Sequence, residues 1–434
     1  MASDRRSLQP RIKRILTAIM LLTLLVLLTS TYLCSRRTEQ FFVNWQAAAN
    51  RLAPQFLQVE TKDYHRQLLT ASALSSVRIA AMHELLFSHQ IRHFAWGVKI
   101  TTTLQSAPLL LAPLQQLDII TEIALDGTMT TRFELPQQRL STGDDSLEIA
   151  GLSGDWSLET AQDQETFNFY LDRLSLRGHN HSAINLEKMT ASGHTSGRET
   201  APEHHGEIHL GTLQWINSNL TIAMLQDLQG FWQTGYNRPY HHGSFLLFLS
   251  DALFAGETFR NGTASISASG ISPDLLHAFK QTLFLLGADF LQNASTLQSQ
   301  PQLLELYAAL SGSGMILSLN EFSLELDGHR LRGQGSLACP KTNSTPLDPL
   351  ENLEINLNLD IDRDAFAAGY RLINRLMFGE RAGTAAILAE QAELLVGGLL
   401  KKGLLSRKNE ATYTFELFLS KGQGMVNGQP LGLN

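Results

Sequence analysis

The segment Leu353 to Asp362, LEINLNLDID, alternates apolar and polar residues at every position. Because successive side chains of a β-strand point to opposite faces, this alternation predicts a strand with one apolar and one polar side. The same period recurs in TFNFYLDRLSLRG around Phe167, in EIHLGTL around Ile208 and in TYTFELFL from Thr412. We therefore expect a chain dominated by strands that each bury one face.

Short turn sequences separate several of these strands. Asp126-Gly127 and Asp327-Gly328 each lie between two alternating runs, and Asn261-Gly262 opens the run TASISASG. Asn427-Gly428 suits a two-residue type I′ turn, in which both central residues have positive φ. Turns this short join neighbouring antiparallel strands, so the pattern predicts a sheet built of meanders.

Three stretches have a helical period instead. Residues from Thr38 to about Leu52 predict a short amphipathic helix, and a block at about 272–312 begins with Ser272 as N-cap before Pro273. A second block, at about 362–403, predicts an amphipathic helix pair on which the apolar side of LEINLNLDID packs. The expected fold class is α+β and β-dominated, with an N-terminal transmembrane helix followed by a large curved antiparallel sheet and two helical blocks packed on it.

The transmembrane helix is expected at 15–33, where ILTAIMLLTLLVLLTSTYL contains no charged residue. As a helix this segment is about 28 Å long, close to the hydrocarbon thickness of a bilayer. Basic residues precede it, which favours a cytoplasmic N-terminus and export of the rest. A cleaved signal peptide is the alternative, but its apolar region is usually shorter, and Tyr32 and Leu33 do not suit small-residue cleavage. The expected organisation is a basic tail (1–14), the anchor (15–33), a juxtamembrane helix and linker (34–58) and a β-rich body (59–434).

Charge is unevenly distributed along the 434 residues. Residues 1–37 hold seven of the 34 basic residues and one of the 41 acidic residues, although the whole chain has a net charge of −7. The acidic remainder repels phosphate groups, so we expect no nucleic-acid binding by the body. The chain has two cysteines, Cys34 and Cys339, which we expect to be free thiols rather than a disulfide framework.

Clustered histidines are the candidate chemistry. A metal site needs three or four converging ligands, and no Cys-x-x-Cys or His-Glu-x-x-His motif accompanies them. The first three of the four clusters named at the end of this paragraph occur in Gly- and Asn-containing sequence, which we interpret as solvated loops. GLSGDW at Gly151 lacks the Gly-x-Ser-x-Gly spacing of a nucleophile elbow. We therefore predict no catalytic, metal or cofactor site, with a periplasmic hydrolase or metal-dependent enzyme as the alternative. The clusters are His179/His181, His204/His205/His209, His241/His242 and His83/His89/His93.

The segments DYHRQLLTASA and LFSHQIRHFAWG resemble motifs of the YdgA-like family of bacterial inner-membrane-anchored periplasmic proteins. They match it in part, whereas Gln67, Phe94 and Ala95 depart from its pattern. GLSG is similar to a family turn, and the C-terminal strand and hairpin are the most similar part. The family is of unknown function, so the resemblance implies a location and a fold without an activity. The matching positions are Tyr64, Arg66, Ile91, His93, Gly151, Gly154, Tyr413, Gly422, Asn427, Gly428 and Pro430.

The expected function is that of a non-enzymatic bacterial envelope protein of interaction or scaffold type, without a cofactor. It is anchored in the inner membrane by residues 15–33, with its body in the periplasm and a lipid or an envelope protein as partner. The layout of anchor and one-faced sheet is similar to that of the AsmA-like bridging proteins, which implies an apolar groove that shelters lipid. An ordinary hydrophobic core is the other use of the same apolar face.

Overall fold

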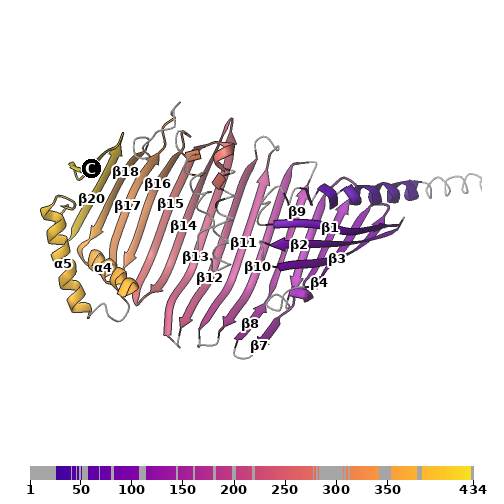
Figure 1. Ribbon diagram of the computed structural model, residues 1–434, viewed down its shortest axis with the longest axis horizontal. Coiled ribbons are helices and arrows are strands. Elements are labelled where there is room, and N and C mark those ends of the chain that lie inside the picture. The colour runs from indigo at the N-terminus through magenta and orange to yellow at the C-terminus, as the bar shows by residue number, and fades with distance from the viewer. Residues whose placement is uncertain are drawn as a thin grey trace, which may run out of the picture. The chain divides into compact units, whose positions relative to one another are not determined.

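In the computed structural model the chain forms two compact units. Figure 1 labels strands and helices of both. Unit 1 comprises Met1–Leu135 and Asp155–Ala161, and unit 2 comprises Pro136–Gly154 and Gln162–Asn434. The described residues are 26–40, 42–44, 46–47, 50, 57–67, 69–79, 83–106, 114–142, 145–159, 162–178, 182–197, 202–217, 220–276, 278–279, 282, 306, 309–310, 313–341, 353–378 and 384–431.

Unit 1 is an antiparallel meander in which strands adjacent in sequence are adjacent in the sheet. The last strand, β9, pairs with β6. The strands are β1 (Leu57–Arg66), β2 (Thr70–Ile79), β3 (His83–Phe94), β4 (Gly97–Ser106), β5 (Asp118–Ala124), β6 (Met129–Leu135) and β9 (Leu152–Glu159).

An N-terminal helix packs on the unit 1 sheet. It is described from residue 26, with helical residues continuing to 50. Cys34 and Phe42 of this helix join a buried cluster with Ile91 and Ile100 of the strands. The described residues from 38 to 50 are helical, as expected. The expected start at Thr38 is wrong, because Thr38 lies inside the helical run 26–40 and its hydroxyl donates to the carbonyl of Cys34 at 2.8 Å.

The predicted membrane anchor falls largely on residues that the structure does not describe. Residues 15–25 lie outside the described range. Among the helices that are described, none has the length and apolar character needed to cross a membrane.

Unit 2 is a longer antiparallel sheet, in the order β7-β8-β10-β11-β12-β13-β14-β15-β16-β17-β18-β20-β21-β22, with β19 also paired to β20. It confirms a β-dominated, antiparallel fold. The strands are β7 (Gln138–Thr142), β8 (Asp145–Ala150), β10 (Gln164–Arg177), β11 (Ala183–Ser196), β12 (Glu203–Asn217), β13 (Leu220–Asn237), β14 (Tyr240–Phe254), β15 (Glu257–Ile271), β16 (Ile316–Leu326), β17 (His329–Ala338), β18 (Glu354–Asp362), β19 (Ser406–Arg407), β20 (Thr412–Ser420), β21 (Gln423–Val426) and β22 (Gln429–Leu431).

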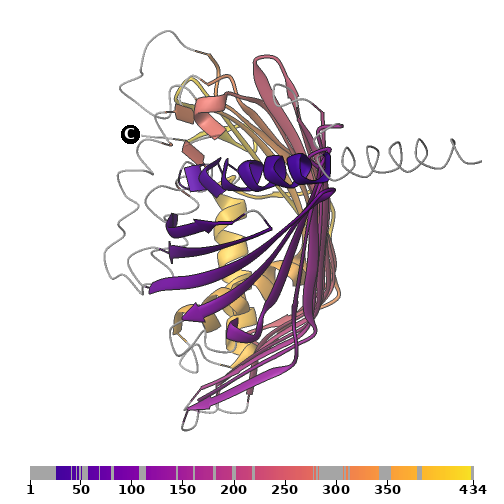
Figure 2. The ribbon, with the colours of Figure 1, turned by 90° about the vertical axis from the view of Figure 1, so that its right-hand side faces the viewer.

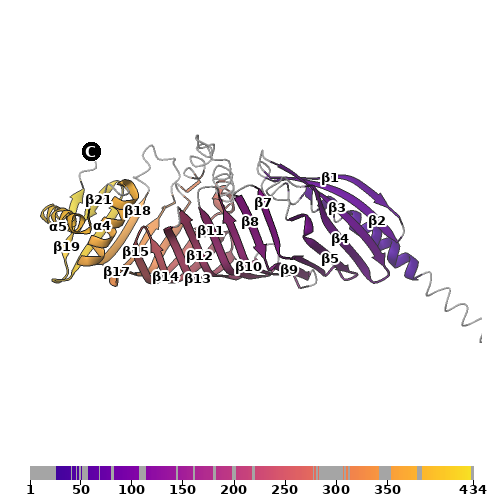
Figure 3. The same ribbon diagram turned by 90° about the horizontal axis from the view of Figure 1, so that it is seen from below.

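Two helices cover one end of this sheet on its concave side (Figures 2 and 3). Helix α4 (Arg363–Phe378) packs against β16, β17 and β18, and α5 (Ala385–Lys401) packs against α4. Val396 of α5 forms a buried cluster with Leu405 and Tyr413, and Phe415 packs against it. The register pairs Ile361 of LEINLNLDID with Tyr413. The expected packing of this strand on the helical block is therefore confirmed for its contact with α4.

A charged cluster fixes α4 to the sheet. Arg371 of α4 donates to Glu257 of β15 at 2.8 and 3.2 Å and to Asp327 at 2.6 Å, and Arg375 is 2.9 Å from Glu257. The Glu257 residue is 1% exposed. Partial burial acts to raise the pKa of Asp327, but the Glu257 side chain, the Thr258 amide and hydroxyl and the Arg371 charge outweigh it and lower that pKa to about 2.

The other predicted helical block is described only at its start and at a few later positions. The Leu275 amide donates to the Ser272 hydroxyl at 3.1 Å, which confirms Ser272 as the N-cap. Leu275 is buried. Most of residues 283–312 lie outside the described range.

The turn predictions are confirmed at three positions and wrong at one. Asp126-Gly127 lies in the β5–β6 turn, and both Asp327-Gly328 and Asn427-Gly428 adopt positive φ at both residues, as a type I′ turn requires. Asn261-Gly262 instead lies inside β15, where Asn261 alone of the two has positive φ, at 50°. The strand begins earlier than expected because Glu257–Arg260 already pair with β14.

Replacing Gly428 by Ala tests the C-terminal turn. No atom lies within 4 Å of a Cβ at this position, but its φ is +76°, so the cost is a backbone cost of about 1 kcal/mol. The urea midpoint of unit 2 is expected to fall accordingly. Gly397→Ala in α5 is the matched control, because the same added methyl in an unobstructed helix stabilises by up to about 1 kcal/mol. Equal shifts of the same sign in both variants would contradict this account.

Candidate functional site: the apolar face of the unit 2 sheet

The strand register of unit 2 aligns apolar residues into ladders that cross the sheet. Directly paired residues of antiparallel strands lie on the same face, so a ladder defines one face. One ladder is Phe167, Gly193, Gly206, Trp232, Phe245, Ile266, Leu319, Gly335, Leu357 and Leu417. The next is Phe169, Ala191, Ile208, Gly230, Leu247, Ala264, Phe322, Gly333, Leu359 and Phe415. We call the face formed by these two ladders the apolar face.

Aromatic rings on the apolar face lie across neighbouring glycines. A Cβ added at Gly193 would lie 2.2 Å from Phe167 Cε1, and one added at Gly206 would lie 2.0 Å from Trp232 Cζ2. Each ring therefore fills the space that a side chain on the next strand would occupy. The result is an apolar surface on which large rings extend over the glycines of the next strand.

Helices α4 and α5 pack at the β16–β20 end, and large residues nearer the other end stay partly accessible. Phe167 is 38% exposed and Phe245 is 37% exposed. Phe167 lies in β10 and Phe245 in β14, so accessible apolar side chains occur at two separate places on the apolar face. Apolar surface left this accessible commonly marks a binding surface.

A doublet of polar residues, with Gly211 as the one exception, interrupts the apolar period at the same level in every strand from β10 to β15. In β10 to β14 the apolar residues flanking it are three positions apart instead of two, as in Leu171-Asp172-Arg173-Leu174 and Leu225-Gln226-Asp227-Leu228. The register places the doublets of neighbouring strands side by side. The doublets are Asp172-Arg173, Glu187-Lys188, Gly211-Thr212, Gln226-Asp227, Ser250-Asp251 and Arg260-Asn261.

Alternate strands have a left-handed residue at this level. Lys188, Asp227 and Asn261 have φ of 55°, 49° and 50°. Gly151, which has φ of 62°, directly follows Ala150, the partner of Arg173 in the β8–β10 register. A left-handed residue within a strand bends it and turns its side chains relative to a regular pleat. We call this line of doublets and left-handed residues the crease. It lets the apolar period shift by one residue at the same level in all these strands.

The opposite face of the sheet is mainly polar. Its ladder between the two apolar ones includes Asn168, Ser192 and Glu207, and Ser192 donates to Glu207 at 3.1 Å. Phe231 and Phe248 are exceptions, with ring centroids 6.2 Å apart and exposures of 38% and 37%.

The histidine clusters do not converge among the described residues, where no group of three or more His, Cys, Asp or Glu could hold a metal ion. The interpretation of His204, His205, His209, His241 and His242 as loop residues is wrong, because they lie in β12 and β14. Adjacent strand residues point to opposite faces, which separates His204 from His205 and His241 from His242. His179 and His181 lie outside the described residues.

The N-terminal motif positions come together around the helix of unit 1. Tyr64 packs against the helix residue Phe42 with ring centroids 5.8 Å apart, and Arg66 pairs with Glu39 of the helix at 2.8 Å. Ile91 and His93 are 1% and 3% exposed in the same unit. These positions hold the helix on the sheet.

The remaining motif positions are far from this group in sequence and belong to turns and packing in unit 2. Gly151 starts the crease and Gly154 lies at the start of β9. Tyr413 packs on α5, Gly422 has φ of 72° in the β20–β21 turn, and Pro430 lies in β22. Asn427 stabilises its turn by accepting the Glu416 amide at 2.8 Å through its side-chain oxygen. Both cysteines are free and buried.

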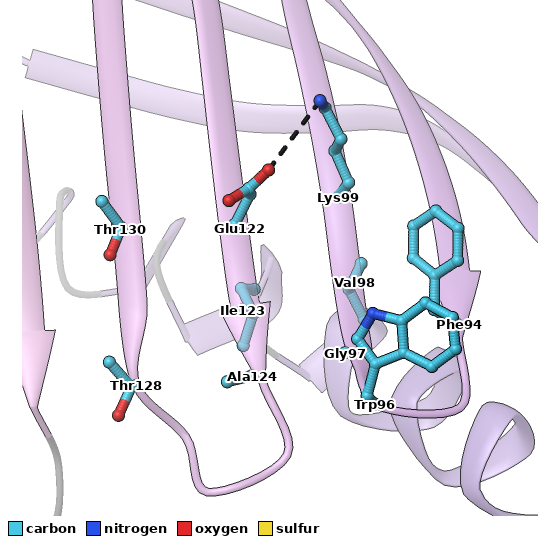
Figure 4. Close-up of a pocket in the computed structure, with 10 residues that line it drawn as sticks. All are labelled: Phe94, Trp96, Gly97, Val98, Lys99, Glu122, Ile123, Ala124, Thr128 and Thr130. Atoms are coloured by element: carbon cyan, nitrogen blue, oxygen red, sulfur yellow. Dashed lines mark ion pairs between the residues drawn. The ribbon is translucent and has the colours of Figure 1, made fainter.

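Two hollows of the described surface are lined by these sheets. One, of about 420 Å³, lies in unit 1 between the β3–β4 and β5–β6 hairpins and is lined by Phe94, Trp96, Lys99 and Glu122, among others (Figure 4). The other, of about 520 Å³, lies on the polar face of unit 2 around Asn358.

Comparison with known proteins places the chain in a family. The model of the family described as "Bacterial protein of unknown function (DUF945)" matches residues 12–434. The chain therefore belongs to this bacterial family. No curated protein matches the chain. No solved structure matches it either.

Proposed function

We propose that this member of the DUF945 family is a non-enzymatic envelope protein that shelters lipid acyl chains on the apolar face of its unit 2 sheet. In this proposal the segment 15–33 anchors the chain in the inner membrane and the body lies in the periplasm. The short motifs around Tyr64 and Asn427 further support a place among YdgA-like members of the family.

The observation that carries the proposal is the accessible apolar face. Two ladders of apolar residues cross the sheet from β10 to β20, and Phe167 and Phe245 keep more than a third of their surface exposed. Rings that lie over Gly193 and Gly206 leave a smooth surface along which a hydrocarbon chain can pack. Burying such a chain stabilises the complex by about 0.8 kcal/mol for each methylene removed from water.

Charge supports acyl chains rather than anionic headgroups as the ligand on this face. The chain has 41 acidic and 34 basic residues, and most of the acidic residues follow residue 37. The ion pairs near the apolar face are internal to the sheet, as between Arg260 and Asp251 at 3.0 Å. A headgroup is therefore expected to stay in solvent while the acyl chain is bound.

Two phenylalanines of β14 allow a matched test. Phe245 lies on the apolar face and Phe248 on the opposite face, and both are 37% exposed. The full chain is purified from bacterial membranes with a photoactivatable phosphatidylethanolamine present, and crosslinked peptides are identified by mass spectrometry. Phe245→Asp is expected to abolish most of the crosslinking to β10–β15, because it places a charge on the lipid-binding face.

Phe248→Asp is the control and is expected to leave crosslinking unchanged. Equal crosslinking in the two variants, or crosslinks confined to the opposite face, would overturn the proposal.

A further inference from the structure

Three turns of unit 1 present large apolar residues at one end of its sheet. Leu69 in the β1–β2 turn is 61% exposed, Trp96 in the β3–β4 turn is 70% exposed, and Leu125 in the β5–β6 turn is 42% exposed. In an antiparallel meander these alternate turns all lie at the same end. Backbone hydrogen bonds confirm that these turns are adjacent. The His93 amide donates to the Leu69 carbonyl at 2.8 Å, and the Leu125 amide donates to the Trp96 carbonyl at 3.2 Å. We call Leu69, Trp96 and Leu125 the rim.

The N-terminal helix runs so that its start lies at the rim. Along the helix, Glu39 pairs with Arg66, Gln46 accepts the Thr61 amide and Asn50 bonds Val59. The helix is therefore antiparallel to β1, and its N-terminal part lies at the end where β1 turns into β2. Arg37 confirms this direction, because its guanidinium donates to the Leu125 carbonyl at 3.0 Å.

The distance along the helix from the end of the apolar run to the rim is short. The apolar run ends at Leu33, four residues before Arg37, and at 1.5 Å per residue this is about 6 Å. The headgroup layer of a bilayer is roughly 5–8 Å thick on each side of the hydrocarbon. If residues 15–33 span the bilayer, the rim falls within this layer.

Side-chain chemistry at the rim suits that layer. Trp96 stacks on Phe94 with ring centroids 5.4 Å apart, which leaves the indole at the tip of the turn (Figure 4). Tryptophan is enriched at membrane–water interfaces, because its ring is apolar and its N–H can still bond water or headgroups. Arg36 and Arg37 add positive charge beside the rim, opposed by Asp126 in the β5–β6 turn.

The N-terminal helix has one buried side and one exposed side near the rim. Thr31, Cys34 and Thr38 are buried, while Tyr32 and Leu33 are 47% and 50% exposed. One side of the helix therefore packs on unit 1, and the other side is accessible at the level of the rim.

We propose that the rim is a bilayer-docking surface that inserts Trp96, Leu69 and Leu125 into the headgroup layer beside the anchor. Docking holds unit 1 against the membrane, so that the anchor and the unit 1 sheet keep a fixed position relative to the bilayer. This inference rests on the proposed membrane anchor, and its test separates the two.

The test uses the full chain in phosphatidylcholine–phosphatidylglycerol vesicles. Flotation after carbonate washing first establishes whether the chain is anchored. Tryptophan emission is then compared in vesicles of ordinary lipid and of lipid brominated near the headgroup end of the acyl chain. Trp96→Phe is expected to remove a large part of the bromine quenching, and Trp156→Phe, in β9 of the same unit, is expected to leave quenching unchanged. Shallow bromines are expected to quench more than bromines near the chain end.

The outcomes are distinct. A chain that does not float overturns the proposed anchor, and the rim inference with it. A chain that floats but shows equal quenching with and without Trp96 overturns the rim inference alone. Quenching lost only in Trp232→Phe, which changes the apolar face, would place the lipid at unit 2 and likewise overturn it. Trp96 emission that changes with protein-to-lipid ratio but not with bromination would assign the rim to a second copy of the chain and overturn bilayer docking.

Discussion

Glu257→Ala is expected to destabilise unit 2 by about 3 kcal/mol, because removing one partner of a buried ion pair leaves the other charges without compensation. The Glu257 side chain is 2% exposed and binds both Arg371, itself 19% exposed, and Arg375. These arginines attach α4 to the hairpin that contains β15. Urea unfolding of the full chain, followed by near-ultraviolet circular dichroism, measures the loss.

Arg260→Ala is the control for this prediction. Its partner is Asp251 at 3.0 Å, and the two side chains are 60% and 41% exposed. Exposed pairs of this kind contribute at most about 1 kcal/mol. A Glu257→Ala midpoint equal to that of Arg260→Ala would show that the buried cluster does not hold α4.

The stability of unit 1 is expected to fall by about 3 kcal/mol between about pH 6.5 and pH 4, owing to His89. This side chain is 7% exposed, and its ring nitrogens lie 2.9 Å from the Thr102 hydroxyl and 3.0 Å from the Ser75 hydroxyl. Burial lowers the pKa of His89 to about 4, against about 6.5 in an unfolded chain. Within this window the unfolded chain binds a proton that the folded unit excludes. The contribution is therefore fully present above pH 6.5 and is lost as the pH falls.

Unfolding of unit 1 can be followed by tryptophan fluorescence. In the variant Trp215→Phe/Trp232→Phe the remaining tryptophans, Trp45, Trp96 and Trp156, all fall in the sequence ranges of unit 1. His89→Gln in this background keeps hydrogen-bonding capacity but does not titrate. The stability difference between the two proteins is expected to change across the window. A difference that stays constant from pH 7.5 to pH 4.5 would contradict the assignment.

Local signals predicted much of the fold. Alternation identified the strand that became β18, and Asp327-Gly328 and Asn427-Gly428 identified tight turns, because positive φ at both central positions requires such residues. The helix pair α4 and α5 followed from its amphipathic period. Each of these features depends on residues close together in the chain.

Other features depended on contacts between distant residues. Nothing near Glu257 indicates that Arg371 lies against it, since the two are 114 residues apart. Asn261-Gly262 was misassigned because a left-handed Asn suits a turn and a creased strand equally. The glycines under Phe167 and Trp232 were overlooked for the same reason, because their role depends on the neighbouring strand. One signal was available, however. The polar doublet recurs in each strand from β10 to β15 and could have aligned those strands before a structure was known.

The crease also constrains how the number of strands in a sheet of this kind can change during evolution. Left-handed residues occur on the alternate strands β11, β13 and β15, at Lys188, Asp227 and Asn261, so each successive pair of strands brings one of them. Duplication or loss of a whole hairpin preserves this alternation and keeps the doublets aligned. Loss of a single strand would place two left-handed strands side by side. The width of the apolar surface can therefore grow or shrink most simply in steps of two strands.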